Sequence, residues 1–244
     1  MQSNFLLLLI SLFVFNPFQR KLIRMTKISI SPELKTRCPG LRLSCIETEV
    51  VVAKSPEGLL SEIDWRIEQL REFLTIEDIS QLRVIAASRH AYKACGKDPA
   101  RYRLSAEALL RRVVTGKGLY QINNVVDQLN LVSIMSGFSI GGYDAGQIQG
   151  DIVFGIGRSG ESYSGIGKGD LNIENLPVFR DELGAFGTPT SDSQRTEVTV
   201  QTRQFLMILI DFDSYQQLEP ASRMAVELLN DNCHATNINT FYVE

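Results

Sequence analysis

An α+β fold is predicted by this 244-residue sequence, because helical and β patterns both occur and do not alternate as βαβ units. Apolar residues recur at helical spacing from Leu59 to Leu74, whereas short β-rich runs occupy the chain beyond Gly141. The run Phe205–Ile210 is apolar at consecutive positions, which predicts a central strand buried on both faces. A hydrophobic content of 44% is ample for a packed core, so we expect one folded domain over residues 25–244.

The first 24 residues are expected to lie outside this domain, as a non-native upstream or disordered segment. Their apolar run, Phe5–Phe15, is shorter than the roughly 20 residues that a membrane-spanning helix needs. Basic residues follow the run instead of preceding it, and no small-residue cleavage pattern comes after it, unlike a secretory signal. Met25 opens a segment typical of an ordinary protein start, so no membrane association is predicted.

The first strand and helix of the domain are predicted from alternation and capping. Cys45–Ala53 alternates apolar and polar residues, which predicts a half-buried strand. Ser55 followed by Pro56 is typical of an N-cap with proline in the first turn, and a helix is expected to follow. Trp65 falls outside the apolar stripe of that helix and is interpreted as a partly buried packing residue.

Three further helices are predicted from a polar residue before each apolar pattern and a glycine after it. The first of them is expected to run continuously from a Thr75–Asp78 capping box towards Tyr92. The predicted caps are Thr75, Ser105 and Asn124, and the predicted ends lie at Gly96, Gly116 and Gly137. Beyond Gly141 we expect strands in DIVF, ESYSGI, VFRDELGAF, RQFLMILIDFD and TFYVE, with a helix in ASRMAVELLNDN.

Several common chemistries find no support in the sequence. The four cysteines have no CxxC spacing and only two histidines accompany them, so we expect reduced thiols in a cytoplasmic protein and no metal. Gly155–Gly160 matches G-x-G-x-x-G but is followed by a poor helix start, which favours a glycine-rich hairpin over a dinucleotide site. Gly165–Asp170 lacks the Lys-Ser/Thr pair of a P-loop, and no cofactor is expected. His90 is interpreted as a packed or capping residue, not a general base.

A basic cluster stands out in a chain whose formal net charge is −3 and whose pI is about 5.6. Such a balance argues against bulk polyanion binding, so any contact with nucleic acid must come from a local patch. The candidate RNA-binding residues are Arg101, Arg103, Arg111, Arg112 and Lys117. Two interpretations are open at this point: phosphate contact, or a solvated helix face on which Glu107 pairs with Arg111.

A series of short motifs lies along residues 92–213, and each motif occurs once. In chain order they are GKDP, RYRLSAEALLRR, GKGL, INNVVDQLN, GGYD, GDI, LPVF and TSDSQRT. In order and spacing they resemble the tRNA-binding and editing module of the phenylalanyl-tRNA synthetase β subunit, known as the B-three/B-four module. The length leaves no room for a synthetase catalytic core or an anticodon-binding region, so the chain resembles a free-standing module and not a complete tRNA ligase.

The resemblance implies a layered β core with flanking helices and a pocket that receives the aminoacylated 3′ end of tRNA. The residues that it places at a substrate pocket are Asn130, Gly141, Gly142, Tyr143, Asp144, Gly187, Thr188, Thr190, Ser191 and Asp192. The candidates for catalysis among them are Asp144, Asp192 and Asn130. Leu129 stands where the synthetase pattern has threonine, and Gly141 and Gly142 stand where it has histidine and alanine.

Three functions remain open from the sequence. The first is hydrolysis of mischarged aminoacyl-tRNA in trans, which in this chain would use a positioned water because no nucleophile motif is present. The second is a non-catalytic RNA-binding module, and the third is a pocket for a free amino acid or a derivative. A screen of mischarged tRNAs for deacylation distinguishes the first from the other two.

Overall fold

The computed structural model describes residues 27–244, so the apolar run Phe5–Phe15 and the expected start at Met25 lie outside the described residues. The described part is α+β, as predicted. Its helices are α1 (Pro32–Arg37), α2 (Glu57–Phe73), α3 (Ile76–Ile79), α4 (Arg83–Ala94), α5 (Ser105–Val114), α6 (Asn124–Ser136) and α7 (Leu218–Cys233). Its strands are β1 (Ile28–Ile30), β2 (Arg42–Glu49), β3 (Ser139–Asp144), β4 (Ile152–Ile156), β5 (Ser162–Gly165), β6 (Gly169–Asn172), β7 (Pro177–Asp181), β8 (Gly184–Thr188), β9 (Ser191–Asp192), β10 (Gln204–Asp211) and β11 (Thr236–Val243).

A four-stranded antiparallel sheet with the order β11-β2-β10-β3 runs through the middle of the molecule. β10 is one of its inner strands, and Leu206, Ile208 and Ile210 are buried, which confirms the prediction of a central strand. The prediction that the strand at Cys45–Ala53 is half-buried is wrong. β2 is buried at six consecutive positions because it lies between β10 and β11 and both faces of the sheet are covered.

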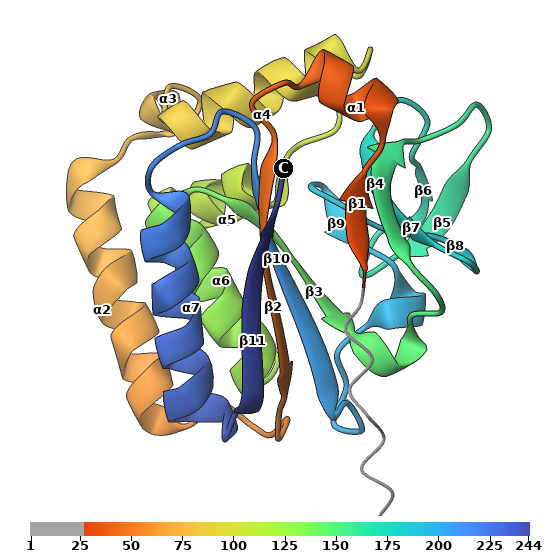
Figure 1. Cartoon of the computed structure of the whole chain (residues 1–244). Coiled ribbons are helices and arrows are strands. Elements are labelled where there is room, and N and C mark those ends of the chain that lie inside the picture. The colour runs from red at the N-terminus through yellow and green to blue at the C-terminus, as the bar shows by residue number, and fades with distance from the viewer. Residues whose placement is uncertain (1–26) are drawn as a thin grey trace, which may run out of the picture.

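The layers on the two faces of this sheet differ (Figure 1). On one face α6 and α7 pack against the sheet, and α2 lies outside them. On the other face lies a five-stranded sheet with the order β1-β4-β7-β8-β9. Successive side chains of β10 point to opposite faces of the sheet. Met207 and Leu209 pack with the helices, and Leu206 and Ile208 pack with the second sheet. The core is therefore layered as helix, sheet and sheet, as expected.

The helix boundaries correct several predicted caps. Thr75 and Asp78 form the expected capping box, but α3 ends at Ile79 and the continuous helix expected towards Tyr92 is two helices. Asn123, not Asn124, caps α6 by accepting from the amides of Val125 and Val126. The Asn124 amide instead bridges to Ala53 N and to the carbonyls of Val51 and Asn232. Tertiary contacts outcompete local capping at this position.

Two other expected caps are also absent. Ser55 does not cap α2, because its hydroxyl donates to the carboxylate of Asp127 over 2.6 Å. Ser105 is the first residue of α5, and Leu104 takes the N-cap position without a side-chain bond. The predicted helix ends at glycine are confirmed, since Gly96, Gly116 and Gly137 all have positive φ.

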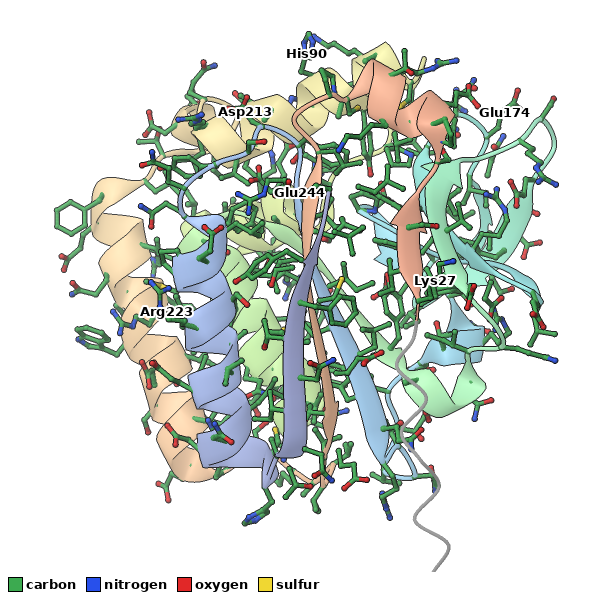
Figure 2. The ribbon with its side chains drawn as sticks, viewed as in Figure 1. Lys27, His90, Glu174, Asp213, Arg223 and Glu244 are labelled. Atoms are coloured by element: carbon green, nitrogen blue, oxygen red, sulfur yellow. The ribbon has the colours of Figure 1, made fainter. Side chains whose placement is uncertain are left out.

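The prediction of a glycine-rich hairpin at Gly155–Gly160 is wrong: Gly155 lies in β4, and the segment leads to β5, which belongs to a different sheet and does not pair with β4. β5 follows the segment where a dinucleotide fold would have a helix, so the G-x-G-x-x-G match is coincidental. The interpretations of Trp65 as partly buried and of His90 as packed or capping are both wrong. Trp65 is 53% exposed on α2. His90 is exposed on α4 and points away from the body of the molecule (Figure 2). Over residues 27–244, no helix combines the length and apolar character that crossing a membrane requires.

Candidate functional site

Two segments predicted to share a site meet between the two sheets: the GGYD motif in β3, and the hairpin β8–β9 with its turn. Gly141 and Gly187 lie on opposite sides of the ring of Tyr143. A Cβ atom on Gly141 would stand 2.1 Å from the Tyr143 hydroxyl oxygen, and one on Gly187 would stand 2.2 Å from it. The ring of Tyr143 therefore fills the space that side chains at these two positions would take, and it packs edge-on against Phe186 at 4.9 Å.

The hydroxyl of Tyr143 is buried and makes no hydrogen bond of regular geometry. Burial raises its pKa well above the ordinary tyrosine value, and the nearby carboxylate of Asp192 raises it further. The hydroxyl in turn lowers the pKa of the Asp192 carboxyl, so the two groups interact although not in regular hydrogen-bond geometry.

Asp192 is the acidic group of the site, and its carboxyl faces β3. The backbone N–H of Gly142 donates to its Oδ2 over 3.2 Å, which joins β9 to β3. Burial raises the pKa of this carboxyl to about 7, against the lowering effects of the Gly142 amide, the Tyr143 hydroxyl and the charge of Lys168. A carboxyl with this pKa exchanges its proton near neutral pH, as a general acid or base does.

Hydroxyl groups surround the turn that joins β8 to β9. The hydroxyls of Tyr92 and Thr190 lie 2.8 Å apart, and the hydroxyl of Tyr163 donates to the Ser191 carbonyl and to Thr188 Oγ1. Thr188 Oγ1 also accepts from the amides of Thr190 and Ser191, each over 3.2 Å. The turn is therefore held rigid by side chains from three elements, α4, β5 and β8.

Lys168 places a cation at the same turn. It lies in the β5–β6 turn, is exposed, and donates from Nζ to the Thr190 carbonyl over 3.0 Å. Its charge acts on Asp192, and the charge of Arg103 acts on Lys168. Lys168 and Arg103 therefore place positive charge near the Asp192 carboxylate, which suits an anionic group such as a phosphate.

The Asp144 carboxylate bonds to groups outside this cluster. Asp144 accepts from Gly146 N and from the Thr202 hydroxyl, each over 2.9 Å, so its carboxylate stabilises a turn. Asn130 is half-buried on α6, next to Leu129. A Cβ on Gly142 would stand 2.5 Å from Leu129 Cδ1, so Leu129 fills the opposite side of β3 from Tyr143.

The five basic candidates divide into engaged and free groups. Arg111 binds the buried carboxylate of Glu107 over 3.1 Å, and Arg89 binds the same carboxylate over 2.9 Å. Arg112 bonds to Gly118 O and to the Tyr120 hydroxyl, and stacks on that ring at 3.8 Å. These contacts are structural.

The other three basic residues, Arg101, Arg103 and Lys117, are exposed. Arg103 also lies 3.8 Å from Glu107. The expected Glu107–Arg111 pair is thus confirmed, but Glu107 is buried, so the pair does not lie on a solvated helix face. The exposed members remain the candidates for phosphate contact.

Sequence reasoning missed Lys168, Tyr163 and Tyr92 as members of the site. Lys168 was considered only as a P-loop residue, and the two tyrosines lie on elements that no local pattern connects to the turn at Pro189. A signal did exist: Lys168 and Tyr163 both lie close to glycines that predict a hairpin, and such a hairpin can fold back over its neighbour.

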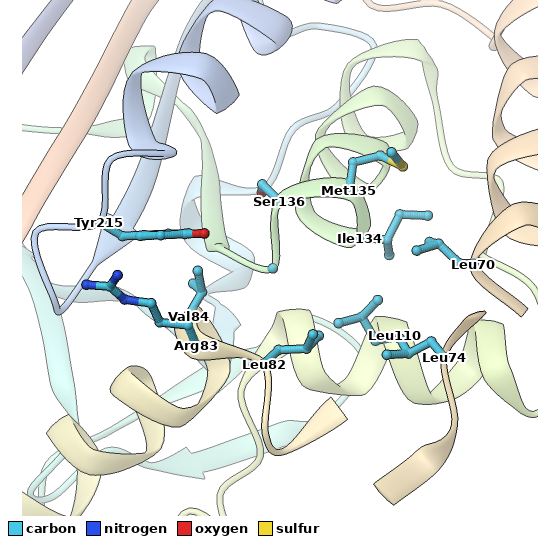
Figure 3. Close-up of a pocket in the computed structure, with 11 residues that line it drawn as sticks. Leu70, Leu74, Leu82, Arg83, Val84, Leu110, Ile134, Met135, Ser136 and Tyr215 are labelled. Carbon is cyan, nitrogen blue, oxygen red and sulfur yellow. The ribbon is translucent and has the colours of Figure 1, made fainter. Parts of the chain in front are cut away.

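A separate cavity of about 210 Å³ lies among the helices, away from this cluster (Figure 3). Its lining is mostly aliphatic and comes from α2, α4, α5 and α6, with Arg83 and Tyr215 at one side. Within the part of the chain that the structure describes, no group of His, Cys, Asp or Glu side chains is arranged to hold a metal ion.

Comparisons with known proteins give a family and a structural relative. The model of the B3/4 domain family matches residues 87–234. The chain is similar in structure to an N-terminal fragment of the phenylalanyl-tRNA synthetase β subunit from Pyrococcus horikoshii, with 13% identity and a TM-score of 0.44. That alignment covers 89% of this chain and 50% of the fragment, so the chain spans about half of the fragment's length. No curated protein matches the chain in sequence.

Proposed function

The chain belongs to the B3/4 domain family, and from this membership and the site geometry we propose that it binds the aminoacylated 3′ end of tRNA and hydrolyses mischarged aminoacyl-tRNA in trans. The motif resemblance to the synthetase β-subunit editing module supports the substrate class. The observation that carries the hydrolytic part is the carboxyl of Asp192, whose pKa of about 7 suits proton exchange with water at neutral pH.

The roles of the residues follow from their places. Lys168 and Arg103 attract the terminal phosphates, because both are exposed cations beside the turn. The ester carbonyl binds beside the Asp192 carboxyl and not over the two glycines of β3, because Tyr143 and Leu129 occupy the space there. Asp192 accepts a proton from water as the water oxygen attacks the carbonyl carbon. The bond to the ribose oxygen then breaks, and the proton passes to that oxygen, which releases the free amino acid and an uncharged tRNA.

A second function, binding of the tRNA end without hydrolysis, is favoured by one specific observation. The ring of Tyr143 fills the space between Gly141 and Gly187, and Leu129 fills the space on the other side of β3. A large amino acid side chain finds no room there unless Tyr143 moves. Binding of the tRNA end therefore needs only the solvent-exposed groups of the site, whereas hydrolysis of an aromatic aminoacyl ester needs the Tyr143 ring to be displaced.

The test is a deacylation screen with tRNAs that carry different wrong amino acids, using the wild-type chain and Asp192→Asn. Loss of general-base assistance is expected to slow hydrolysis by about 10²-fold or more. The matched control is Asp170→Asn, which alters an exposed carboxylate on β6 and should leave the rate unchanged. If the wild-type chain binds tRNA but hydrolyses none of the charged species, the non-catalytic function replaces the deacylase. If Asp192→Asn keeps the full rate, Asp192 is not the base.

A further inference from the structure

Two buried cysteines meet where helices α1 and α4 end. Cys38 is the C-cap residue of α1 and Cys95 is the C-cap residue of α4. They are 5% and 1% exposed and belong to the same apolar core, although they lie 57 residues apart in the chain. Next to them, Arg37 donates from Nη1 to the carbonyl oxygen of Ala94 over 3.2 Å. The two helix ends are thus joined both by the side chains and by the neighbouring backbone.

The two thiols are neighbours in this core, as the Arg37–Ala94 hydrogen bond between the adjacent residues requires. The Cys95 thiol lowers the pKa of Cys38, and the Cys38 sulfur raises the pKa of Cys95. The guanidinium of Arg37 also favours the Cys38 thiolate. The remaining cysteines differ, because burial raises the pKa of Cys45 and raises that of Cys233 to about 12.

We propose that Cys38 and Cys95 form a reversible redox pair, in which oxidation converts the two thiols into a disulfide that ties α1 to α4. This site is independent of the proposed tRNA chemistry. With hydrogen peroxide as the oxidant, the Cys38 thiolate attacks one peroxide oxygen, which gives a sulfenic acid and hydroxide. The Cys95 sulfur then attacks the Cys38 sulfur and the S–OH oxygen leaves as water. In total two thiols lose two electrons and two protons, and one peroxide becomes two waters.

The location connects the pair to the turn at Pro189. Tyr92, three residues before Cys95 on α4, holds Thr190 through its hydroxyl. Lys97, two residues after Cys95, donates from Nζ to the carbonyl oxygens of Asn172 and Glu174. A disulfide at Cys95 would therefore anchor the stretch of chain that supports the candidate site from one side.

The experiment is oxidation of the whole chain with hydrogen peroxide, followed by thiol counting in denaturant and peptide mass mapping. We expect the thiol count to fall from four to two, with a loss of 2 Da and a linked peptide pair that contains Cys38 and Cys95. Because the closed loop is long, the melting temperature of the oxidised protein should rise by about 5 °C or more, and dithiothreitol should reverse the rise.

The variants Cys38→Ser and Cys95→Ser separate this pairing from general oxidation. Neither should show the 2 Da loss or the rise in melting temperature, whereas Cys233→Ser should show both. Four free thiols after oxidation would overturn the proposal. So would a linked pair that includes Cys45 or Cys233, or an accumulation of Cys38 sulfinic acid in the wild-type chain, because a neighbouring thiol traps the sulfenic acid first.

Discussion

Asp192 shows how much the chemistry of a residue depends on the chain around it. As part of the motif TSDSQRT it resembles an ordinary turn aspartate. In the folded protein it accepts a hydrogen bond from Gly142 in another strand, and burial raises its pKa to about 7. The cost of burying this charge is measurable as a dependence of stability on pH.

Between about pH 4 and pH 7 the folded protein holds a proton on Asp192 that the unfolded chain has lost, so stability falls as the pH rises through that range. Asp192→Asn removes this dependence. At pH 8 the variant should be more stable than the wild type by about 1 to 3 kcal/mol, and near pH 4 the difference should vanish. Urea unfolding at the two pH values measures this, and Asp170→Asn serves as the control. An equal difference at both pH values would contradict a raised pKa.

Two buried tyrosines offer a matched comparison of hydroxyl groups. Tyr143 makes no regular hydrogen bond through its hydroxyl, whereas the hydroxyl of Tyr92 bonds to Thr190. Tyr92→Phe should lower the free energy of unfolding by about 1 kcal/mol, and Tyr143→Phe should lower it by less, because the Tyr143 hydroxyl meets the Asp192 carboxyl only in irregular geometry. Chemical denaturation of both variants makes the comparison. If Tyr143→Phe were the more destabilising of the two, its hydroxyl would have a well-placed partner in solution.

At this scale, the sequence placed Gly141 and Gly187 in motifs expected to share a site, but it left the choice between Asp144 and Asp192 open, because both carboxylates lie in those motifs. It could not predict that the ring of Tyr143 turns back over Gly141. That orientation depends on the missing side chains at Gly141 and Gly187, which lie on different strands. Lys168 was missed for a similar reason, since its position follows from the way one hairpin folds over another.

At the scale of elements, the packing of α6 on β3 depends on one large and one absent side chain. Leu129 Cδ1 occupies the place of a Cβ on Gly142. Where this chain has leucine and glycine, the synthetase pattern has threonine and alanine. The side chain on the helix is therefore larger in this chain, and the side chain on the strand is smaller. Such compensating pairs are expected to couple energetically, because both residues share one contact.

Gly142→Ala alone should therefore destabilise the protein by about 1 to 3 kcal/mol through overpacking. Leu129→Thr alone should also destabilise it, because buried apolar volume is removed. The double variant should recover about 1 kcal/mol or more relative to the sum of the two, and a double-mutant cycle in urea measures the recovery. Additive effects would show that α6 and β3 adjust independently. Gly58→Ala is a useful control, since nothing lies near its Cβ.

The ends of the elements were predicted less well than their existence. Local capping rules succeeded at Thr75 and at the glycine ends, where only groups within about one turn of the same chain segment take part. They failed at Ser55 and Asn124, because each polar side chain found a stronger partner in a distant segment. Alternation in β2 was also misleading, since a second layer buries the face that was expected to meet solvent.

At the scale of the whole molecule, the surface charge decides how RNA could be held. Arg101 and Lys117 are the exposed members of the basic set with no acidic partner of their own among the ion pairs of residues 27–244 that we describe. If they bind phosphates, reversing both to glutamate should weaken tRNA binding. It should also reduce the slope of log affinity against log salt by roughly 0.7 to 0.9 for each phosphate that the variant no longer neutralises.

The control for this measurement is Arg223→Glu, which reverses an exposed charge on α7 (Figure 2). Binding isotherms at several salt concentrations give the slopes. Equal slopes for the wild type and the double variant would assign Arg101 and Lys117 to an uninvolved surface. Reversal of Arg111 and Arg112 is a poorer test, because it would also disrupt their bonds with Glu107 and Tyr120.

The sheet order has a consequence for the time at which the protein can fold. β2 lies between β10 and β11, so its neighbours are made more than 150 residues later, and the Thr48 hydroxyl bonds to the carbonyl of Thr236, 188 positions away. Contacts of this separation make folding slow, and here they delay completion of the sheet until β10 and β11 have left the ribosome. The helices can form earlier, and β10 can then pair with one edge of β2, but the other edge stays unpaired until β11 arrives. A chain cut after Cys233 would keep one edge of β2 permanently open to pairing with other molecules.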